Sequence, residues 1–324
     1  MASEPRNDTV DMTQLLWNNW SVLTEGGNVI SFNRTNITHT LQSSDYSIST
    51  VINNVIMLIC LCGLVGNGIV IWLLGFCMKR NAYGVYILNL AIADFTYILA
   101  GVLQIIALLT NSINYLFKFA NLLSLSSYSV GLSLLMAINI ERCLSVLWPI
   151  WYKCHRPAHL STVLCVLIWG LFVSFSVVKF VCEYLAVKNV YIMRRLYDTL
   201  SLLTFPVLIV SSGILLLRFQ SFSRRRQSTK LYITILLNVL AFLLLNVPRG
   251  IYVTCIWTTS YDLNIWSFLI LLCVVNSTVN PFIYFFVGQY GKEQGWKSLR
   301  EVLQSALTDD ESVIDQRRGN SIPR

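Results

Sequence analysis

The chain has 324 residues, of which 55% are hydrophobic and only 12% are charged, and its formal net charge at pH 7 is +8. Soluble globular proteins carry about 25% charged residues, so this composition excludes a soluble protein and favours one embedded in a membrane. The basic residues lie mainly in short connections between apolar stretches, which favours contact with membrane lipids over nucleic-acid binding.

Residues 1–50 precede the first apolar stretch and are predicted to form an extracellular, glycosylated tail. Their Asn-x-Ser/Thr sequons have the acceptors Asn7, Asn19, Asn33 and Asn36. One such triplet carries little weight, but a cluster of them ahead of the first span indicates a segment that faces the lumen during synthesis. Because the start of the chain is polar, no cleavable signal peptide is expected.

Seven apolar stretches follow, at residues 51–76, 84–110, 116–147, 158–182, 196–219, 231–257 and 263–287. A helix needs about 20 residues to cross the hydrocarbon core of a bilayer, and every stretch reaches that length. We therefore predict an all-α membrane protein whose seven-transmembrane helix bundle occupies residues 51–290.

The short loops predict the orientation of this bundle. Their basic residues fall on one side of it: Lys79, Arg80, Lys153, Arg156, Arg218, Arg224, Arg225, Arg226, Lys230, Lys292, Lys297 and Arg300. By the positive-inside rule that side is cytoplasmic. An odd number of spans then puts the N-terminus outside and the C-terminus inside, at the plasma membrane.

Residues 291–307 do not form another span. Apolar residues recur there at helical spacing with charged residues between them, which predicts a short amphipathic helix at the inner membrane interface. Its apolar face comprises Trp296, Leu299, Val302, Leu303, Ala306 and Leu307. Residues 308–324 are polar and are predicted to be a disordered cytoplasmic tail.

A carboxylate, Asp94, lies near the middle of the second stretch. A carboxylate at the centre of a spanning helix costs about 2.5–3.5 kcal/mol on insertion scales, so it should face the bundle interior and have partners. Its candidate partners are polar residues in the middle of other stretches: Asn67, Asn276, Ser277 and Asn280. Such a polar core has the groups to hold a cation or a proton. A static set of hydrogen bonds between helices is the alternative.

The third stretch runs without a break into the ionised pair Glu141-Arg142. One broad face of a helix there would hold Asn121, Tyr128 and Arg142. A single helix would thus connect a polar position near the outer surface with a cation near the inner surface. Prolines lie inside three stretches, at Pro206, Pro248 and Pro281, and predict kinks.

Other function classes have little support. No span offers paired carboxylates, a nucleophile with its base, or a His/Cys ligand set, so neither an enzyme, a metal site nor a cofactor is expected. A membrane transporter or channel remains an alternative, but no internal repeat is visible and only Asp94 is clearly intramembrane.

The residues at seven places in the stretches are those of a known class. They are Gly66-Asn67, Leu90-Ala-Ile-Ala-Asp94, Glu141-Arg142-Cys143, Trp169, Pro206, Pro248 and Asn280-Pro-Phe-Ile-Tyr284. With these residues the chain resembles a class A, rhodopsin-like G-protein-coupled receptor from about residue 51 to residue 307. The string Glu141-Arg-Cys-Leu-Ser-Val-Leu-Trp-Pro-Ile-Trp-Tyr152, with those at 71–76, 85–90, 230–232 and 282–288, resembles the Mas-related receptors within that class.

This resemblance implies a mechanism and partners. An extracellular peptide or small molecule would shift a two-state bundle, the sixth helix would swing outward, and a heterotrimeric G protein would dock inside. Arg142 would be held by Glu141 at rest and would reach the G protein when active. Asn280, Pro281 and Tyr284 would form the seventh-helix switch, and Asp94 would stand at the sodium-site carboxylate. Membrane lipids and arrestin are further implied partners.

The chain departs from the pattern of the class in several places. Phe117 stands near the usual outer cysteine, and no cysteine follows Cys182 before Cys255. Asn246 precedes Pro248 by two residues, where the class usually has tryptophan, and Gly131 replaces a sodium-site serine. These departures concern the residues of activation and not those that predict the fold.

The outer ends of the predicted helices are basic, which disfavours a strongly cationic ligand. Our predicted pocket comprises Asn121, Tyr128, Asp198, Arg249 and Tyr252. A ligand with an acidic group would pair with Arg249 or with Arg194-Arg195. The alternative is that these arginines lie in water or among lipid headgroups.

Overall fold

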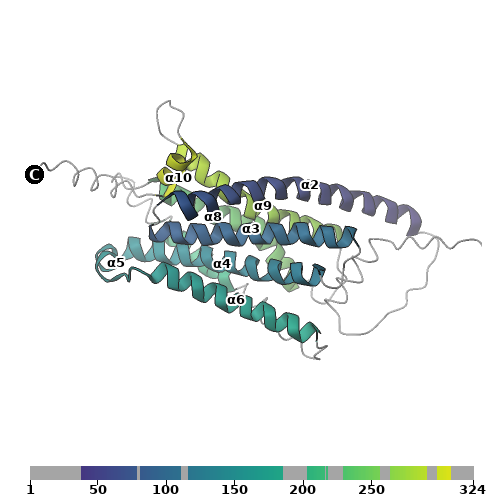
Figure 1. Cartoon of the computed structure of the whole chain (residues 1–324), viewed down its shortest axis with the longest axis horizontal. Helices are drawn as coiled ribbons and strands as arrows, with labels where there is room; N and C mark the ends of the chain where they lie inside the picture. Colours follow the sequence, from purple (N-terminus) through teal and green to yellow (C-terminus); the bar gives the residue numbers. More distant parts are fainter. Residues whose placement is uncertain are drawn as a thin grey trace, which may run out of the picture.

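The computed structural model describes residues 38–78, 81–110, 116–184, 203–215, 217, 229–255, 263–289 and 298–307. The elements are α2 (Thr38–Trp72), the π-helical turn η1 (Leu73–Cys77), α3 (Ala82–Leu109), α4 (Lys118–Leu147), α5 (Pro149–His155), α6 (Leu160–Tyr184), α8 (Thr229–Cys255), α9 (Leu263–Gln289) and α10 (Leu299–Leu307). A further helical segment covers Leu203–Leu215. The long helices run side by side along the long axis of the molecule (Figure 1).

The fold is a seven-transmembrane helix bundle, as the sequence predicts. Five helices are long and apolar enough to cross a membrane, within α2–η1, α3, α4, α6 and α9. Two shorter apolar helices, Leu203–Leu215 and Leu236–Tyr252, lie in the fifth and sixth predicted stretches. The remaining parts of those two stretches lie partly outside the described residues.

The first helix begins earlier than the sequence predicts. Helix α2 starts at Thr38, whereas its apolar part begins only at Val51. Residues 38–50 are polar, but they contain neither proline nor glycine to break a helix. Hydropathy marks where a helix becomes apolar, and it does not mark where the helix starts. The sequons at Asn7, Asn19, Asn33 and Asn36 lie outside the described residues.

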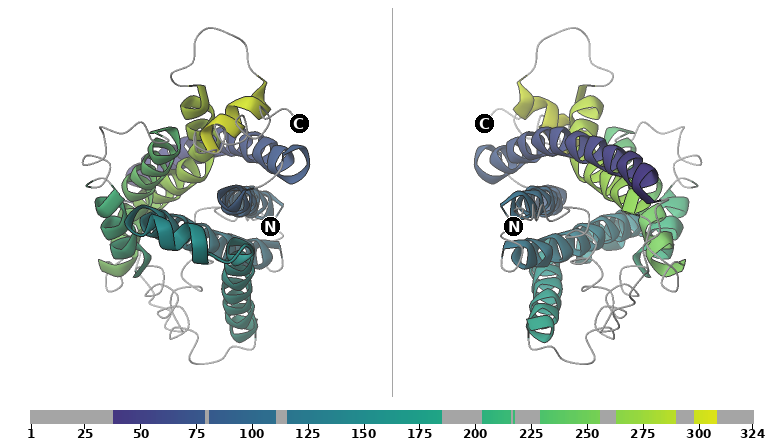
Figure 2. Two further views of the ribbon diagram at one scale, coloured as in Figure 1. Left: turned by 90° about the vertical axis from the view of Figure 1, so that its left-hand side faces the viewer. Right: turned by 90° about the vertical axis from the view of Figure 1, so that its right-hand side faces the viewer.

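The helices pack in a fixed order of neighbours. Helix α3 packs between α2 and α4, α2 also contacts α9, and α9 contacts α8. Helix α6 contacts α4 and lies at the edge of the bundle, which both end-on views show (Figure 2). Many apolar side chains of α6 are exposed and suit contact with lipid. Its backbone polar groups need no contact with water, because a spanning helix satisfies them internally.

A close crossing of three helices fixes the packing near the middle of α2. A Cβ atom added at Gly63 would lie 2.5 Å from Cδ1 of Ile98 in α3 and 2.5 Å from Oγ1 of Thr278 in α9. Only glycine therefore permits this approach of the helices without a shift of neighbouring side chains. The crossing brings α9 against α2 and α3, where the polar core lies.

Helices α8 and α9 continue through their internal prolines, Pro248 and Pro281. Pro206 lies in the segment Leu203–Leu215. The kinks expected at these residues stay predictions.

The predicted amphipathic helix corresponds to α10, of which Val302 and Leu303 are buried. A Cβ atom at Gly288 would lie 2.8 Å from Cγ1 of Val302, so α10 packs closely against the end of α9. The side chains of Arg300 and Glu301 are exposed. Trp296 lies outside the described residues. Two residues of the predicted apolar face, Val302 and Leu303, therefore pack into the bundle, whereas Leu299 is exposed.

Candidate functional site

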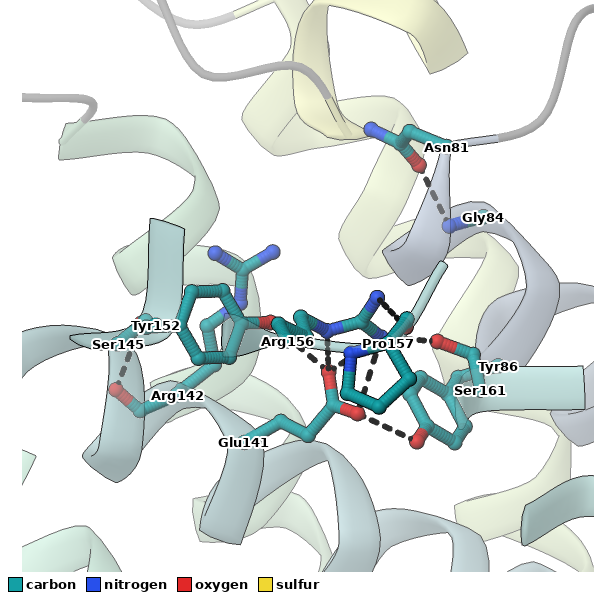
Figure 3. A network of polar contacts seen from close by, with 10 residues as sticks. All are labelled: Asn81, Gly84, Tyr86, Glu141, Arg142, Ser145, Tyr152, Arg156, Pro157 and Ser161. Atoms are coloured by element: carbon teal, nitrogen blue, oxygen red, sulfur yellow. Dashed lines mark hydrogen bonds and ion pairs between the residues drawn. The ribbon is translucent and has the colours of Figure 1, made fainter. Parts of the chain in front are cut away.

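Glu141 is buried near the C-terminal end of α4, the end that the sequence predicts to be the inner one. Two phenols donate hydrogen bonds to its carboxylate. The hydroxyl of Tyr86 in α3 lies 2.8 Å from Oε1, and the hydroxyl of Tyr152 in α5 lies 2.9 Å from Oε2 (Figure 3). Helix α5 begins with Pro149 at its first turn, where proline is favoured, and this short helix brings Tyr152 back against α4.

Arg156 completes this inner site with an ion pair. Its Nη2 atom lies 3.0 Å from both carboxylate oxygens of Glu141, and its Nε atom lies 3.3 Å from Oε2. The side chains of Arg156 and Glu141 are only 12% and 10% exposed. Arg156 Nη2 also donates to the hydroxyl of Ser161 at the start of α6. One carboxylate thus joins α3, α4, α5 and α6.

The surroundings keep Tyr152 and Arg156 protonated. Burial raises the pKa of the Tyr152 phenol, and the nearby charge of Glu141 raises it further. Burial alone would lower the pKa of the Arg156 guanidinium, but Glu141 outweighs that effect and raises the pKa above its usual value. Both groups therefore remain donors to the carboxylate at neutral pH.

Glu141 pairs with Arg156 in this structure, and the expected hold of Glu141 on Arg142 stays a prediction. The guanidinium of Arg142 points away from the Glu141 carboxylate and lies 4.7 Å from the ring centroid of Tyr83 (Figure 3). Consecutive side chains on a helix diverge by about 100°, so a residue outside the helix reaches the carboxylate more directly. Arg156 is such a residue.

Sequence reasoning missed Tyr86, Tyr152, Arg156 and Ser161 as site residues. The sequence analysis used Arg156 only as one of the basic loop residues that predict the orientation of the bundle. No spacing rule connects Tyr86 with a residue 55 positions later. The one local signal for the contact of Tyr152 with Glu141 is Pro149, which starts a new helix and turns the chain back.

The polar core lies at the crossing of α2, α3 and α9. The Nδ2 atom of Asn280 donates to Oδ2 of Asp94 at 2.7 Å. The Nδ2 atom of Asn67 donates at 3.0 Å to the backbone carbonyl of Ser277. The Oδ1 atom of Asn276 is buried without a hydrogen-bond partner among the described residues. Hydrogen bonds thus join four of the five predicted polar-core residues in two pairs, Asp94 with Asn280 and Asn67 with Ser277.

The residues of α9 that are predicted to form a switch lie next to this core. Asn238 of α8 is buried, and its Nδ2 atom donates to the hydroxyl of Tyr284 at 3.5 Å. Pro281 lies inside α9, and a Cβ atom at Gly66 would lie 3.3 Å from it. Tyr284 therefore links α8 and α9 on the inner side of Asp94 and Asn280.

Three of the five predicted pocket residues lie together toward the opposite, predicted outer end of the bundle, in a cluster that we call the outer site. The guanidinium of Arg249 in α8 lies 4.4 Å from the ring centroid of Tyr128 in α4 and 5.8 Å from that of Trp266 in α9. The rings of Tyr252 and Trp266 are 6.3 Å apart, and those of Tyr97 and Tyr128 are 5.9 Å apart.

The places of the other two residues, Asn121 and Asp198, in the pocket stay predictions. Asn121 lies two helical turns before Tyr128. Asp198 lies outside the described residues. Trp266 and Tyr97 are additions that sequence reasoning missed, because aromatic residues are common throughout these apolar stretches.

The described part of the chain offers no group of three or more His, Cys, Asp or Glu side chains that would hold a metal ion. The cysteines that the structure describes are free thiols: Cys60, Cys62, Cys77, Cys143, Cys154, Cys165, Cys182 and Cys273.

A helix bundle with a glutamate–arginine pair ending one helix and a polar core around an aspartate defines the class of rhodopsin-like receptors. The family model described as "7 transmembrane receptor (rhodopsin family)" matches residues 66–195. Among known proteins, the chain is 39% identical to Mas-related G-protein coupled receptor member A1 of Mus musculus over 289 residues, which cover 84% of this chain and 95% of the relative. It is 40% identical to member X1 of Homo sapiens over 272 residues, which cover 81% and 84%.

Member X3 of Macaca mulatta is 41% identical over 270 residues, which cover 79% of this chain and 83% of the relative. The chain belongs to the Mas-related G-protein-coupled receptor family. It is a multi-pass membrane receptor, and neither a transporter nor a channel is favoured. The family is one of receptors and not of enzymes.

Proposed function

We propose that this receptor binds its ligand at the outer site around Tyr128, Arg249 and Tyr252 and couples to a heterotrimeric G protein through Arg142. The observation that carries the proposal is that α4 holds parts of both sites. Tyr128 and Arg142 are 14 positions apart on this helix, which corresponds to about 21 Å at 1.5 Å per residue. A shift of α4 against its neighbours therefore acts on both ends.

Helix α8 supplies the second connection. Arg249 lies at the outer site, and Asn238 contacts Tyr284 on the inner side of the polar core. A ligand that draws α8 toward α4 and α9 changes this inner contact. A ligand shifts the bundle only by the difference between its affinities for the two states, so the outer contacts must differ between them.

The inner site is the coupling region in this proposal. Arg156, Tyr86 and Tyr152 hold Glu141 in place, and Arg142, whose guanidinium lies 4.7 Å from the ring centroid of Tyr83, moves toward the G protein. Asn280, Pro281 and Tyr284 form the switch in α9 that accompanies the motion.

The remaining partners follow from this orientation. The N-terminal tail lies outside the cell, where peptides or small molecules reach the outer site, and the C-terminal tail lies in the cytoplasm. Arrestin and the lipids of the plasma membrane are further partners at the inner face.

The test is the variant Arg142→Ala in cells, with calcium and cyclic-AMP readouts against a panel of peptides and small molecules. We expect ligands that activate the unaltered receptor to give no response with this variant, while its surface expression stays measurable. Arg300→Gln, which removes an exposed charge from α10, is the matched control and should respond normally. A full response from Arg142→Ala at equal surface expression would overturn the proposal.

A further inference from the structure

We infer that the ring of Tyr83 holds Arg142 in the resting receptor and thereby restrains signalling in the absence of a ligand. This inference rests on the proposed function, because it names what keeps the proposed coupling residue away from the G protein. The guanidinium of Arg142 lies 4.7 Å from the centroid of the Tyr83 ring. A guanidinium within about 6 Å of a ring centroid is attracted by the negative face of the ring.

Burial makes this contact stronger than a similar contact at a surface. Tyr83 is 5% exposed and belongs to the main apolar core of the bundle, and Arg142 is half-buried. A cation over an aromatic face gains more when water is excluded from the contact. Other contacts of Arg142, with the predicted hold by Glu141 among them, would add to the share that the ring supplies.

The Tyr83 ring comes from the first turn of α3, which is capped. Figure 3 shows the backbone N–H of Gly84 donating a hydrogen bond to Oδ1 of Asn81, at a distance of 2.7 Å. Asparagine is favoured at the start of a helix because its side chain satisfies a backbone donor that the helix leaves open. The cap fixes the turn that carries Tyr83, and α3 packs along α4. The ring therefore has a set place against the end of α4.

The same turn of α3 also holds the neighbour of Arg142. Tyr83 and Tyr86 are three positions apart, and residues at that spacing lie on one face of a helix. The hydroxyl of Tyr86 donates to Glu141 at 2.8 Å, and the ring of Tyr83 contacts Arg142. One face of α3 thus contacts both residues of the Glu141-Arg142 pair, the first through a hydrogen bond and the second through a ring.

The residues on either side of Arg142 are tied to neighbouring elements. Side chains of α3 and α5 bind Glu141, and Sγ of Cys143 donates to the backbone carbonyl of Ser211 at 3.2 Å. These contacts oppose a rotation of the end of α4 about its own axis. Arg142 then reaches a G protein by a swing of its long side chain, and this swing takes the guanidinium off the Tyr83 ring.

Ligand-free nucleotide exchange on a heterotrimeric G protein measures the restraint, with the purified full-length receptor. Tyr83→Phe keeps the ring, Tyr83→Leu removes it, and Tyr83→pentafluorophenylalanine keeps its outline but reverses the charge of its face. We expect Tyr83→Phe to exchange at nearly the unaltered rate. The other two variants should exchange up to about tenfold faster, which corresponds to about 1.4 kcal/mol between the two states.

The fluorinated ring separates attraction from packing. An unchanged rate with Tyr83→pentafluorophenylalanine would mean that Tyr83 only fills space, and it would overturn the inference even if Tyr83→Leu were faster. If Tyr83→Leu does not fold, the comparison of the two phenylalanines still decides. Phe172→Leu is the matched control, because it removes a buried ring of α6, and it should leave ligand-free exchange unchanged.

A double-mutant cycle assigns the effect to Arg142. Thermal unfolding is compared for the unaltered receptor, Tyr83→Leu, Arg142→Ala and the double variant. We expect Tyr83→Leu to lower the unfolding temperature less when the guanidinium is already absent, because the contact is then lost only once. Phe172→Leu should lower it equally in both backgrounds. Equal losses for Tyr83→Leu in both backgrounds would show that the ring does not hold Arg142.

The response of Arg142→Ala to the panel of peptides and small molecules separates this inference from the proposed function. Loss of that response, with ligand-free exchange unchanged in every Tyr83 variant, removes the inference and leaves the proposed function in place. A full response of Arg142→Ala removes the proposed function, and the restraint through Arg142 falls with it.

Discussion

The carboxylate of Glu141 joins more elements than any sequence motif around it indicates. It accepts hydrogen bonds from Tyr86 and Tyr152 and forms an ion pair with Arg156. A buried carboxylate is stable only when enough donors replace the water it has lost. The inner end of the bundle therefore depends on donors that come from three other helices or loops.

Removing the cation of this site should destabilise the receptor. We expect Arg156→Gln to lower the free energy of unfolding by up to about 3 kcal/mol, because it leaves a nearly buried carboxylate without its ion-pair partner. Thermal unfolding of the purified receptor measures the loss. The double variant Glu141→Gln with Arg156→Gln should recover part of it, and Arg300→Gln should show little change. An unfolding temperature of Arg156→Gln equal to that of Arg300→Gln would contradict this role.

The phenol of Tyr152 predicts a pH dependence. Tyr152→Phe removes a hydrogen bond to a charged group and should cost about 1.5–3 kcal/mol at neutral pH. Because the pKa of Tyr152 is raised by folding, the contribution of this bond is complete below the ordinary tyrosine pKa of about 10 and is lost as the pH rises beyond it.

The measurement is the difference in unfolding temperature between the unaltered receptor and Tyr152→Phe across neutral and alkaline pH. It should stay constant up to about pH 10 and shrink above it. A difference that already falls between neutral pH and that value would mean that the phenol loses its proton earlier than its surroundings imply.

At the scale of elements, one face of α8 connects the two ends of the receptor. Asn238, Phe242, Asn246 and Tyr252 are all buried, and Arg249 shares their helical face. Asn238 lies at the proposed switch and Arg249 lies at the outer site. Phe242 lies between them on α8 and packs against Phe205, with ring centroids 5.4 Å apart. A rotation of α8 therefore moves the Asn238–Tyr284 contact and the Arg249 site together.

The junction of α9 and α10 gives a second prediction at this scale. Gly288→Ala places a Cβ atom 2.8 Å from Cγ1 of Val302 and against its backbone carbonyl, so α10 must shift. We expect a loss of about 1–3 kcal/mol in packing, visible as faster hydrogen exchange of the backbone amides in α10. Gly170→Ala in α6 is the matched control, because nothing lies within 4 Å of its added Cβ. Equal exchange in both variants would show that α10 does not depend on this contact.

At the scale of the whole molecule, two signals in the sequence agree on the orientation. The sequons lie before the first span, and the basic loops lie on the opposite side of an odd number of spans. We expect glycosidase treatment to reduce the apparent mass, and replacement of Asn7, Asn19, Asn33 and Asn36 by glutamine to remove that shift. An antibody to a C-terminal tag should bind only after cells are permeabilised. Binding of that antibody to intact cells would reverse the orientation.

The sequence by itself determined the class of fold and the places of the polar residues along it. Apolar length, the mid-span Asp94 and the asparagines of α2 and α9 are properties of single stretches, and a helix has a regular period. The sequence also predicted that these asparagines would be partners of Asp94, because few groups within a membrane can stabilise a charge. Asn280 is such a group, and it binds Asp94.

Only the tertiary structure decided which arginine pairs with Glu141 and which rings surround Arg249. Arg156 reaches Glu141 because the turn through α5 carries it back to α4, and Trp266 meets Arg249 because α9 packs on α8. These contacts join residues on separate elements. Helical period fixes the face on which a side chain lies, whereas the packing of the helices fixes what that face meets.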